Sequence, residues 1–550
     1  MRRSNRRKFD PDQKSKANTK MDSINVQFRP NPSHRSNLFS RNTKHSSTIT
    51  KSNVVISALI AVTICSFCYV FVIGFRISFK RRFGIVIDGG STGSRIHVFE
   101  YGIKGGAPDF DFGKKGLASL RVNPGLSAYE KDPETAGGSL KELVEFAKKK
   151  VPKECWGETE IRLMATAGLR MVDLAVQDKI LESCRRVLRS SGFKFRDHWA
   201  SVITGSDEGM YAWVVANYAL GTLGGDPLKT TGIIELGGAS AQVTFVSSEP
   251  IPSEFSHVVK FGNISYNLYS HSFLQFGQNV AHDILRESLI AGAQDPTTES
   301  IQKEKSIDPC TPSGYSHDMS SWMLSPGSMA EKSKYVSVLQ PRGNFSECRS
   351  AALSLLQKGK EKCSYQHCYI GSAFIPKLQG KFLATENFFH TAKIFGIPPK
   401  ASISDFIRAG QQFCEEDWPK LRVKYHSYED DDLLRYCFSA AYIVALLHDS
   451  LEIPLEDNRI GFTNQVGDIP LDWALGAFIL QSTAELSAEH PNWIDNSATS
   501  DSSTLIVLFI IFVILLFSAW YLSRWKKPQL KTIYDLEKGK YIVTRVCRHP

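Results

Sequence analysis

The same pattern occurs twice along this chain: an apolar run, then a carboxylate, then a pair of glycines. Residues 84–87 (Gly-Ile-Val-Ile) lead into Asp88 and Gly89-Gly90, and residues 232–234 (Gly-Ile-Ile) lead into Glu235, Leu236 and Gly237-Gly238. Hydroxyl or amide side chains follow each glycine pair. The apolar runs predict buried strands, and the glycines predict a tight turn after each one. Backbone N–H groups and hydroxyls in such turns bind phosphate, and the carboxylate can hold a hydrated cation beside it.

One such turn would be weak evidence, because Asp-Gly-Gly is common in hairpins. Two turns in matching contexts predict twin lobes that hold one polyphosphate between them. The length of 550 residues exceeds a single hydrophobic core and agrees with two or more lobes. The hydrophobic content of 42% and the charged content of 22% are those of an ordinary globular protein.

A third segment, residues 161–170, predicts a strand, a turn and a helix in succession. Thr166 and Arg170 follow the strand and could face the cleft between the lobes. The alternative for this segment alone is an ordinary strand–helix joint with a solvated arginine.

A fourth segment, residues 201–213, predicts a strand that ends at Thr204 and a helix that Ser206 caps. Glu208 falls in the first turn of this helix, where an acidic side chain also complements the helix dipole. Because the segment lies between the two phosphate-binding turns, Glu208 is equally a candidate to take a proton from an attacking water.

Two long uncharged runs predict transmembrane helices at residues 53–75 and 504–522. The first is too long and too far from the N-terminus for a cleaved signal peptide, so we expect a retained signal anchor. Acidic residues precede the second span and basic residues follow it, which predicts a cytosolic C-terminal side. Both tails are then cytosolic, and the segment between the spans is lumenal or extracellular.

The basic charge of the chain belongs to its tails. Residues 1–52 contain 13 Lys and Arg against 3 Asp, and residues 523–550 contain 8 against 2 acidic residues, whereas the whole chain carries +10. The segment between the spans is therefore net acidic. Basic tails are typical of the cytosolic face of a membrane, so the charge does not indicate a nucleic-acid partner. We expect the polar N-terminal tail to be disordered.

Eight of the eleven cysteines lie between the predicted spans, which predicts four disulfides in an oxidising compartment. Sequential pairing is the simplest arrangement and predicts Cys155–Cys184, Cys310–Cys348, Cys363–Cys368 and Cys414–Cys437. No CxxC pair occurs among them, so a zinc site is not indicated. Asn263 and Asn344 begin glycosylation sequons and are candidate glycan sites.

Together these segments resemble, in order and spacing, the signature regions of the nucleoside triphosphate diphosphohydrolases, or apyrases. A fifth signature stands at residues 472–478 (DWALGAF), and the run YSHSFLQFG at residues 269–277 also resembles the family. The resemblance covers roughly residues 83–486 and includes the cysteine layout. The flanking spans resemble those of membrane-anchored plant members.

The resemblance implies a duplicated actin-like (ribonuclease H-like) α/β fold, with an active-site cleft between two lobes. Residues 83–204 would form the first lobe, completed by residues 466–490, and residues 205–465 would form the second. Residues 491–503 would link the lobes to the second span.

The resemblance also assigns roles by position. Glu208 would be the catalytic base, and Ser240 and Gln242 would orient the attacking water. Asp88 and Glu235 would hold Ca²⁺ or Mg²⁺ through water, with Trp473 nearby. The phosphate groups would be bound by Gly90, Ser91, Thr92, Gly93, Ser94, Arg95, Thr166, Arg170, Gly237, Gly238, Ala239 and Ser240.

The implied activity is hydrolysis of the terminal phosphoanhydride of nucleoside tri- or diphosphates, in the Golgi, a vesicle or at the plasma membrane. Glu235 stands where the family usually has Asp, so a nucleotide-binding pseudoenzyme or receptor of the same fold is one alternative. Another phosphohydrolase, such as an exopolyphosphatase, is a second. The sequence leaves open the preferred base, ATP versus ADP, Ca²⁺ versus Mg²⁺ and the oligomeric state.

Overall fold

The computed structural model of the chain describes residues 81–104, 107–112, 116–292, 306–315 and 339–489. It also describes Ile64 and residues 512–518, 520, 530–535, 537 and 539–545. The tail 1–52 and the linker 491–503 lie outside the described residues, as does most of each predicted span. No helix in the described part of the chain is both long enough and apolar enough to cross a membrane.

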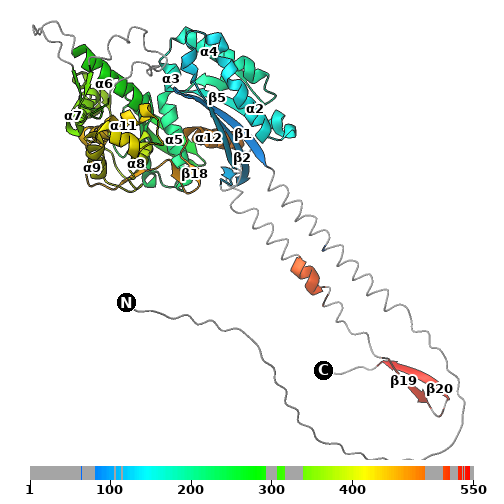
Figure 1. Ribbon diagram of the computed structural model, residues 1–550. Coiled ribbons are helices and arrows are strands. Elements are labelled where there is room, and N and C mark those ends of the chain that lie inside the picture. The colour runs from blue at the N-terminus through cyan, green and yellow to red at the C-terminus, as the bar shows by residue number, and fades with distance from the viewer. Residues whose placement is uncertain are drawn as a thin grey trace, which may run out of the picture. The chain divides into compact units, whose positions relative to one another are not determined.

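The first sheet of the two-lobed region (residues 81–489) forms around the first apolar run. Strand β1 (Arg82–Gly89) pairs antiparallel with β2 (Ser94–Lys104) and parallel with β5 (Glu160–Ala165). The order is β3-β2-β1-β5-β6, with β4 paired to β2. These outer strands are β3 (Ala107–Phe110), β4 (Leu117–Val122) and β6 (Ala200–Val202). Figure 1 shows this sheet beside α2 (Leu140–Lys150) and α4 (Leu174–Arg189).

The second sheet forms around the second apolar run, in the order β16-β15-β7-β8-β10-β9. Its strands are β7 (Gly232–Leu236), β8 (Ser240–Val246), β9 (Ser256–Phe261), β10 (Ile264–Leu274), β15 (Phe382–Glu386) and β16 (Ile460–Phe462). Strand β7 pairs antiparallel with β8 and parallel with β15. Each sheet therefore repeats one plan: a glycine turn joins two antiparallel strands, and two parallel strands follow on the other side.

Two helices, α5 (Gly205–Ala219) and α12 (Trp473–Glu489), form a layer that contacts both sheets (Figure 1). Alternation along the strands explains this packing. Ile85 and Ile87 point to the core of the first lobe, whereas Val86 points to the central core that contains α5 and α12. In β7, Ile233 likewise belongs to the central core, whereas Ile234 belongs to the core of the second lobe.

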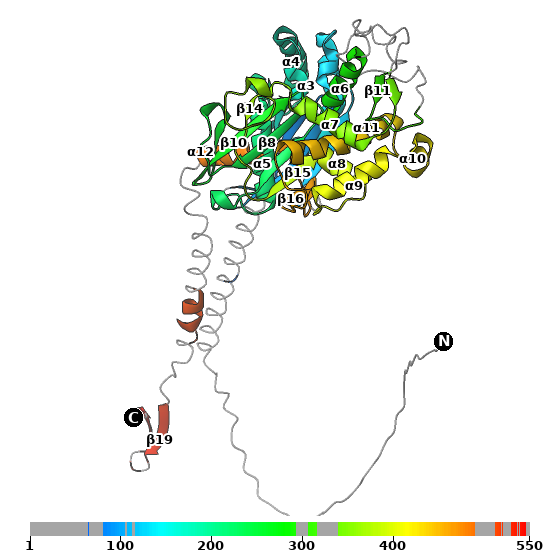
Figure 2. The ribbon, with the colours of Figure 1, turned by 90° about the vertical axis from the view of Figure 1, so that its left-hand side faces the viewer.

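Helices of the second lobe cover the outer face of its sheet, as Figure 2 shows for α7, α8, α9 and α11. Their bounds are α6 (Gln278–Gly292), α7 (Phe345–Leu356), α8 (Asn387–Ile394), α9 (Ile403–Cys414), α10 (Trp418–Lys424) and α11 (Asp430–Val444). A π-helical turn, η10 (Ala445–Ser450), continues α11. Three of the predicted disulfides are present in this lobe: Cys310–Cys348, Cys363–Cys368 and Cys414–Cys437.

The predicted bridge Cys155–Cys184 is absent, because both cysteines are free thiols. Cys184 lies on α4 and is fully buried in the core of the first lobe, whereas Cys155 is half-buried in η3 (Lys153–Glu158) at the edge of that core. Both sulfurs thus serve as apolar packing groups. Sequential pairing considers only separation along the chain, which does not decide whether two thiols are bonded in the fold.

The remaining described elements are short. The strands are β11 (Ser306–Asp308), β12 (Leu339–Pro341), β13 (Cys368–Ile370), β14 (Ala373–Phe374), β17 (Gln465–Val466), β18 (Ile469–Pro470), β19 (Leu530–Asp535) and β20 (Lys540–Arg545). The helical turns are α3 (Ala167–Arg170), η1 (Leu126–Tyr129), η2 (Pro133–Ser139), η4 (Asp197–Trp199), η5 (Pro227–Lys229), η6 (Ser253–Phe255) and η9 (Lys360–Lys362).

Candidate active site

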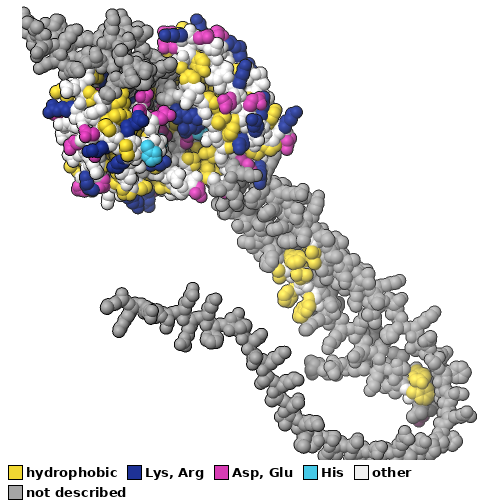
Figure 3. Space-filling model, viewed as in Figure 1, with side chains coloured by type: hydrophobic (Ala, Val, Ile, Leu, Met, Phe, Trp, Pro, Cys, Tyr) yellow, Lys and Arg dark blue, Asp and Glu magenta, His cyan; other side chains and the backbone are white. Residues whose placement is uncertain are grey.

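The two glycine turns face one another across the space between the sheets. The first turn joins β1 to β2, and the second joins β7 to β8. A Cβ atom placed on Gly238 would lie 3.7 Å from Ser91 Oγ, so the second turn reaches the first. Figure 3 shows a hollow between the two halves of the molecule, with basic side chains gathered beside it. The predicted pair of turns therefore forms one site.

The second turn depends on a close approach by Gly277. A Cβ atom at this position would lie 2.3 Å from Ser240 N and 2.4 Å from Ala239 C. The first amides of α6 donate to the turn, from Gln278 N to Gly237 O at 2.9 Å and from Asn279 N to Gly238 O at 3.0 Å. Only glycine fits at this packing distance.

A cavity of about 150 Å³ opens between the turns. The predicted residues that line it are Asp88, Gly90, Ser91, Thr92, Gly93, Arg95, Thr166, Glu208, Glu235, Gly237, Gly238, Ala239, Ser240 and Trp473. Four further residues line it: Arg121, Ala167, Glu386 and Asp472. Ser94, Arg170 and Gln242 do not line the cavity, although the sequence grouped them with the site. Ser94 and Gln242 are buried behind it, and Gln242 Nε2 donates to Ser240 Oγ at 2.9 Å.

Glu208 reaches the cavity from the first turn of α5. The N-cap of this helix is Thr204, whose Oγ1 accepts from Asp207 N at 3.1 Å, while Asp207 Oδ2 accepts from Thr204 N at 3.3 Å. The prediction that Ser206 caps the helix is therefore wrong. Helical geometry begins two residues earlier than predicted, at Gly205, and Ser206 Oγ donates instead to Ser270 O at 3.1 Å.

Arg170 contacts Glu208. Its Nη2 lies 2.5 Å from Glu208 Oε2, and both side chains are largely buried. Burial raises the pKa of Glu208, whereas the charge of Arg170, its hydrogen bond and a hydrogen bond from Gln242 act in the opposite direction. The net direction is upward. A carboxyl group with a raised pKa that remains paired with a cation is suited to accept a proton near neutral pH.

Asp88 and Glu235 lie on the inner faces of their strands. They follow the alternation of Val86 and Ile233, so they point toward the space between the sheets. Burial is the main cause that raises the pKa of both carboxyls, and repulsion from Glu208 adds to it. Asp88 Oδ1 and Glu235 Oε2 are buried without a hydrogen-bond partner.

These unpartnered oxygens fit a divalent cation, because a cation would satisfy them and offset their mutual repulsion. No group of three or more His, Cys, Asp or Glu side chains in the described ranges is arranged to ligate a metal directly.

Asp472 fixes the start of α12 beside the cavity. Its Oδ1 accepts from Ala474 N at 2.9 Å, and its Oδ2 lies 3.6 Å from Arg95 Nη1 and 3.4 Å from His97 Nε2. The next residue, Trp473, stacks on Tyr211 of α5 with ring centroids 6.5 Å apart. The side chains of the first sheet thus hold Trp473 at the site.

Glu386, Arg121 and Asp472 were not assigned roles from the sequence. Glu386 ends β15 with φ 58°, a conformation uncommon for a residue other than glycine, and its N–H donates to Asn464 Oδ1 at 2.7 Å. A signal existed for it, since an apolar strand ends in a carboxylate here as it does at Asp88 and Glu235. Arg121 donates to Thr92 Oγ1 at 2.6 Å from β4, and no local pattern marks it.

The comparison with known proteins decides the family. Residues 77–491 match the GDA1/CD39 (nucleoside phosphatase) family. The chain belongs to this family. The resemblance to the apyrases inferred from the sequence is therefore confirmed.

Several GDA1/CD39 relatives cover most of the chain. "Probable apyrase 6" of Arabidopsis thaliana is 55% identical over 545 residues, which cover 97% of this chain and 98% of that protein. "Probable apyrase 4" of the same plant is 59% identical over 403 residues, which cover 73% and 79%. "Ectonucleoside triphosphate diphosphohydrolase 3" of Mus musculus is 29% identical over 442 residues, which cover 74% and 80%.

A solved structure shares the GDA1/CD39 architecture described above. The nucleoside triphosphate hydrolase structure from Neospora caninum matches with a TM-score of 0.54 at 16% identity, covering 80% of this chain and all of that one. At this identity the match shows the fold, a mixed α/β arrangement of two sheets.

Proposed function

We propose that this protein is an apyrase that hydrolyses the terminal phosphoanhydride of nucleoside tri- or diphosphates. The observation that carries the proposal is one cavity lined by both phosphate turns, by Glu208 and by the carboxylates Asp88 and Glu235. The family, and relatives named as apyrases over nearly the whole chain, support the same activity. The products are orthophosphate and the nucleotide shortened by one phosphate.

The turns bind the polyphosphate. Ser91 and Thr92 of the first turn line the cavity, with Arg95 at the start of β2 and Ser240 at the start of β8, and so supply it with hydroxyls and a guanidinium. Arg121 Nη2 holds Thr92 Oγ1, which orders that hydroxyl before the substrate binds. Positioned donors and cations of this kind carry phosphoryl transfer without a covalent intermediate.

Glu208 acts as the general base. It removes a proton from a water molecule as the water oxygen bonds to the terminal phosphorus, and the bond from that phosphorus to the bridging oxygen breaks. Ser240 orients the water, and Gln242 fixes Ser240 through their 2.9 Å hydrogen bond. Arg170 favours the ionised form of the Glu208 carboxyl and holds its orientation through their 2.5 Å contact.

Asp88 and Glu235 would hold Ca²⁺ or Mg²⁺ through water, with Thr166 and Trp473 close by. When bound, such an ion neutralises charge on the phosphate oxygens. The cavity is lined by five carboxylates and only two arginines. A polyanionic substrate would be repelled by this excess of negative charge, and the bound cation would offset the repulsion.

The catalytic region is proposed to be lumenal or extracellular, held by spans at residues 53–75 and 504–522. Three disulfides in the second lobe support an oxidising compartment. Asn263 is exposed at the β9–β10 turn and is accessible to a glycan. Asn344 caps α7 through its Oδ1 and donates from Nδ2 to Glu347 Oε1, so a glycan there would replace one of its hydrogen bonds.

The test is phosphate release by the full chain in detergent, with ATP, ADP, UDP and GDP, in Ca²⁺, Mg²⁺ or EDTA. We expect cation-dependent release that E208Q slows by about 10²- to 10⁴-fold and that Glu142→Gln, on the exposed face of α2, leaves unchanged. A folded protein that binds nucleotide and cation but releases no phosphate would instead favour the pseudoenzyme. Glu235→Asp would then test whether this position accounts for the lost activity.

A further inference from the structure

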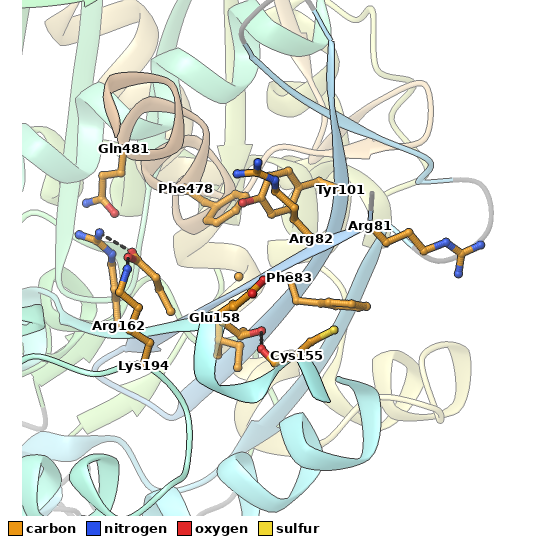
Figure 4. A pocket seen from close by; sticks show the side chains of 14 residues that line it. Arg81, Arg82, Phe83, Tyr101, Cys155, Glu158, Arg162, Lys194, Phe478 and Gln481 are labelled. Carbon is orange, nitrogen blue, oxygen red and sulfur yellow. Dashed lines mark hydrogen bonds and ion pairs between the residues drawn. The ribbon is translucent and has the colours of Figure 1, made fainter. Parts of the chain in front are cut away.

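A second cavity, of about 280 Å³, lies at the opposite end of β1 from the catalytic turns. It is bounded by the start of β1, the end of η3 and one face of α12 (Figure 4). Eight residues of β1 span roughly 25 Å between the two places. The mechanism proposed above uses none of the side chains in this cavity.

Basic side chains outnumber acidic ones in the lining, four (Arg81, Arg82, Arg162 and Lys194) against two (Glu158 and Glu160). Arg162 Nη2 and Lys194 Nζ are held by Glu160 at 2.7 and 2.8 Å, so they form a fixed cluster at one side. Arg82 lies at the other side and has no ion-pair partner among the residues that the structure describes. In Figure 4 its guanidinium lies beside the rings of Tyr101 and Phe478, whereas Arg81 points away. The cavity is therefore suited to an anion.

Gln481 supplies a second, independent feature. Its side chain is hydrogen-bonded to the hydroxyl of Tyr211, which fixes the orientation of the amide. Gln481 Oε1 is nevertheless buried without a hydrogen-bond partner, although it belongs to a residue that lines the cavity. A buried acceptor of this kind requires a donor, and a hydroxyl group on a ligand provides one, whereas an apolar ligand does not.

We propose that this cavity binds a small phosphate ester that carries a free hydroxyl. Its phosphate would be held by Arg82 with the cluster of Arg162 and Lys194, and its hydroxyl would donate to Gln481 Oε1. Phe478 would contact its carbon skeleton. Such an ester could be a phospholipid headgroup, since Arg81 stands only six positions after the predicted span that ends at residue 75, or a soluble metabolite.

The first measurement is calorimetric titration of the full chain in detergent with myo-inositol 1-phosphate, in EDTA. We expect saturable binding that Arg82→Glu weakens about tenfold or more, as loss of a charge-assisted contact should. Q481L should weaken it as well. Arg408→Glu, an exposed arginine on α9, is the matched control and should bind as the wild type does.

Arg95→Ala distinguishes this cavity from the catalytic one. Binding that survives Arg95→Ala and fails in Arg82→Glu supports the proposal, whereas the reverse pattern overturns it. To distinguish a phospholipid headgroup from a soluble metabolite as the ligand, the chain is reconstituted in phosphatidylcholine bilayers with and without phosphatidylinositol. Competition by the lipid against myo-inositol 1-phosphate identifies a headgroup site, and unaltered binding identifies a soluble ligand. Absence of binding to both probes overturns the proposal.

Discussion

Arg170 Nη2 lies 2.5 Å from Glu208 Oε2, which joins a helical turn after β5 to the first turn of α5. The ion pair sits just behind the cavity between the two phosphate turns. Because burial raises the pKa of Glu208 and Arg170 opposes that rise, the pair adjusts the pH range in which the carboxylate is available as a base.

Replacing Glu208 with Gln should lower kcat by about 10²- to 10⁴-fold, the usual contribution of a general base. The amide keeps the shape of the side chain and cannot take the proton. Nucleotide affinity, measured by equilibrium binding, should change far less than kcat. An equal loss of affinity and rate would instead make Glu208 a binding residue.

Replacing Arg170 with Met should move the acidic limb of the kcat/KM profile to higher pH. Arg170 lowers the pKa of Glu208, so its removal raises that pKa further. Glu208 acts only when ionised, and activity is then lost at a higher pH than in the wild type. Arg186→Leu removes a surface pair with Glu134 and should leave the profile in place. An unshifted limb in Arg170→Met would mean that another group controls it.

Replacing Glu235 with Gln should stabilise the protein in EDTA and abolish the stabilisation that a divalent cation produces. Asp88 and Glu208 repel the buried carboxylate of Glu235, and its Oε2 has no partner. Relief of this repulsion is expected to contribute about 1–3 kcal/mol. Thermal unfolding in EDTA and in Ca²⁺ or Mg²⁺ measures both effects without reference to activity. A cation-induced shift that persists in Glu235→Gln would exclude this residue from the cation site.

Replacing Glu386 with Gln should lower KM for ATP more than KM for ADP. Burial and repulsion from Asp472 raise the pKa of the Glu386 carboxyl, and its remaining negative charge faces the cavity that receives the polyphosphate. Removal of one such charge should improve the binding free energy of the more highly charged ATP by about 1 kcal/mol, which lowers its KM roughly fivefold relative to that of ADP. The ratio of the two KM values measures it. Equal effects on both substrates would contradict a role in selecting phosphate number.

Thiol reagents should modify Cys155 in the native protein and leave Cys184 unmodified. Burial raises the pKa of the Cys184 thiol to about 12, and its side chain has no access to solvent. Peptide mapping by mass spectrometry before and after denaturation reports each site. A peptide pair joined through Cys155 and Cys184 under non-reducing conditions would contradict the free thiols of the structure.

The parts of the site that lie within a few residues of one another could be predicted from the sequence. A strand, its terminal carboxylate and its glycine turn are contiguous, so the pattern around Asp88 and Glu235 located both halves of the cavity. Glu208 was a candidate because its segment lies between the two phosphate-binding turns along the chain, and in the structure it lines the cavity between them. The repeat of the pattern also predicted two sheets, because each strand needs its own buried partners.

Contacts between distant segments were decided only by the tertiary structure. Nothing local relates Arg170 to Glu208 or Arg121 to Thr92, because such pairs depend on how the helices and strands pack. Glu386 enters the site only because β15 lies beside β7. Cys155 and Cys184 are free thiols, although pairing in sequence order joined them. Sequence determined the local strand-and-turn units, whereas packing decided which side chains from different units meet.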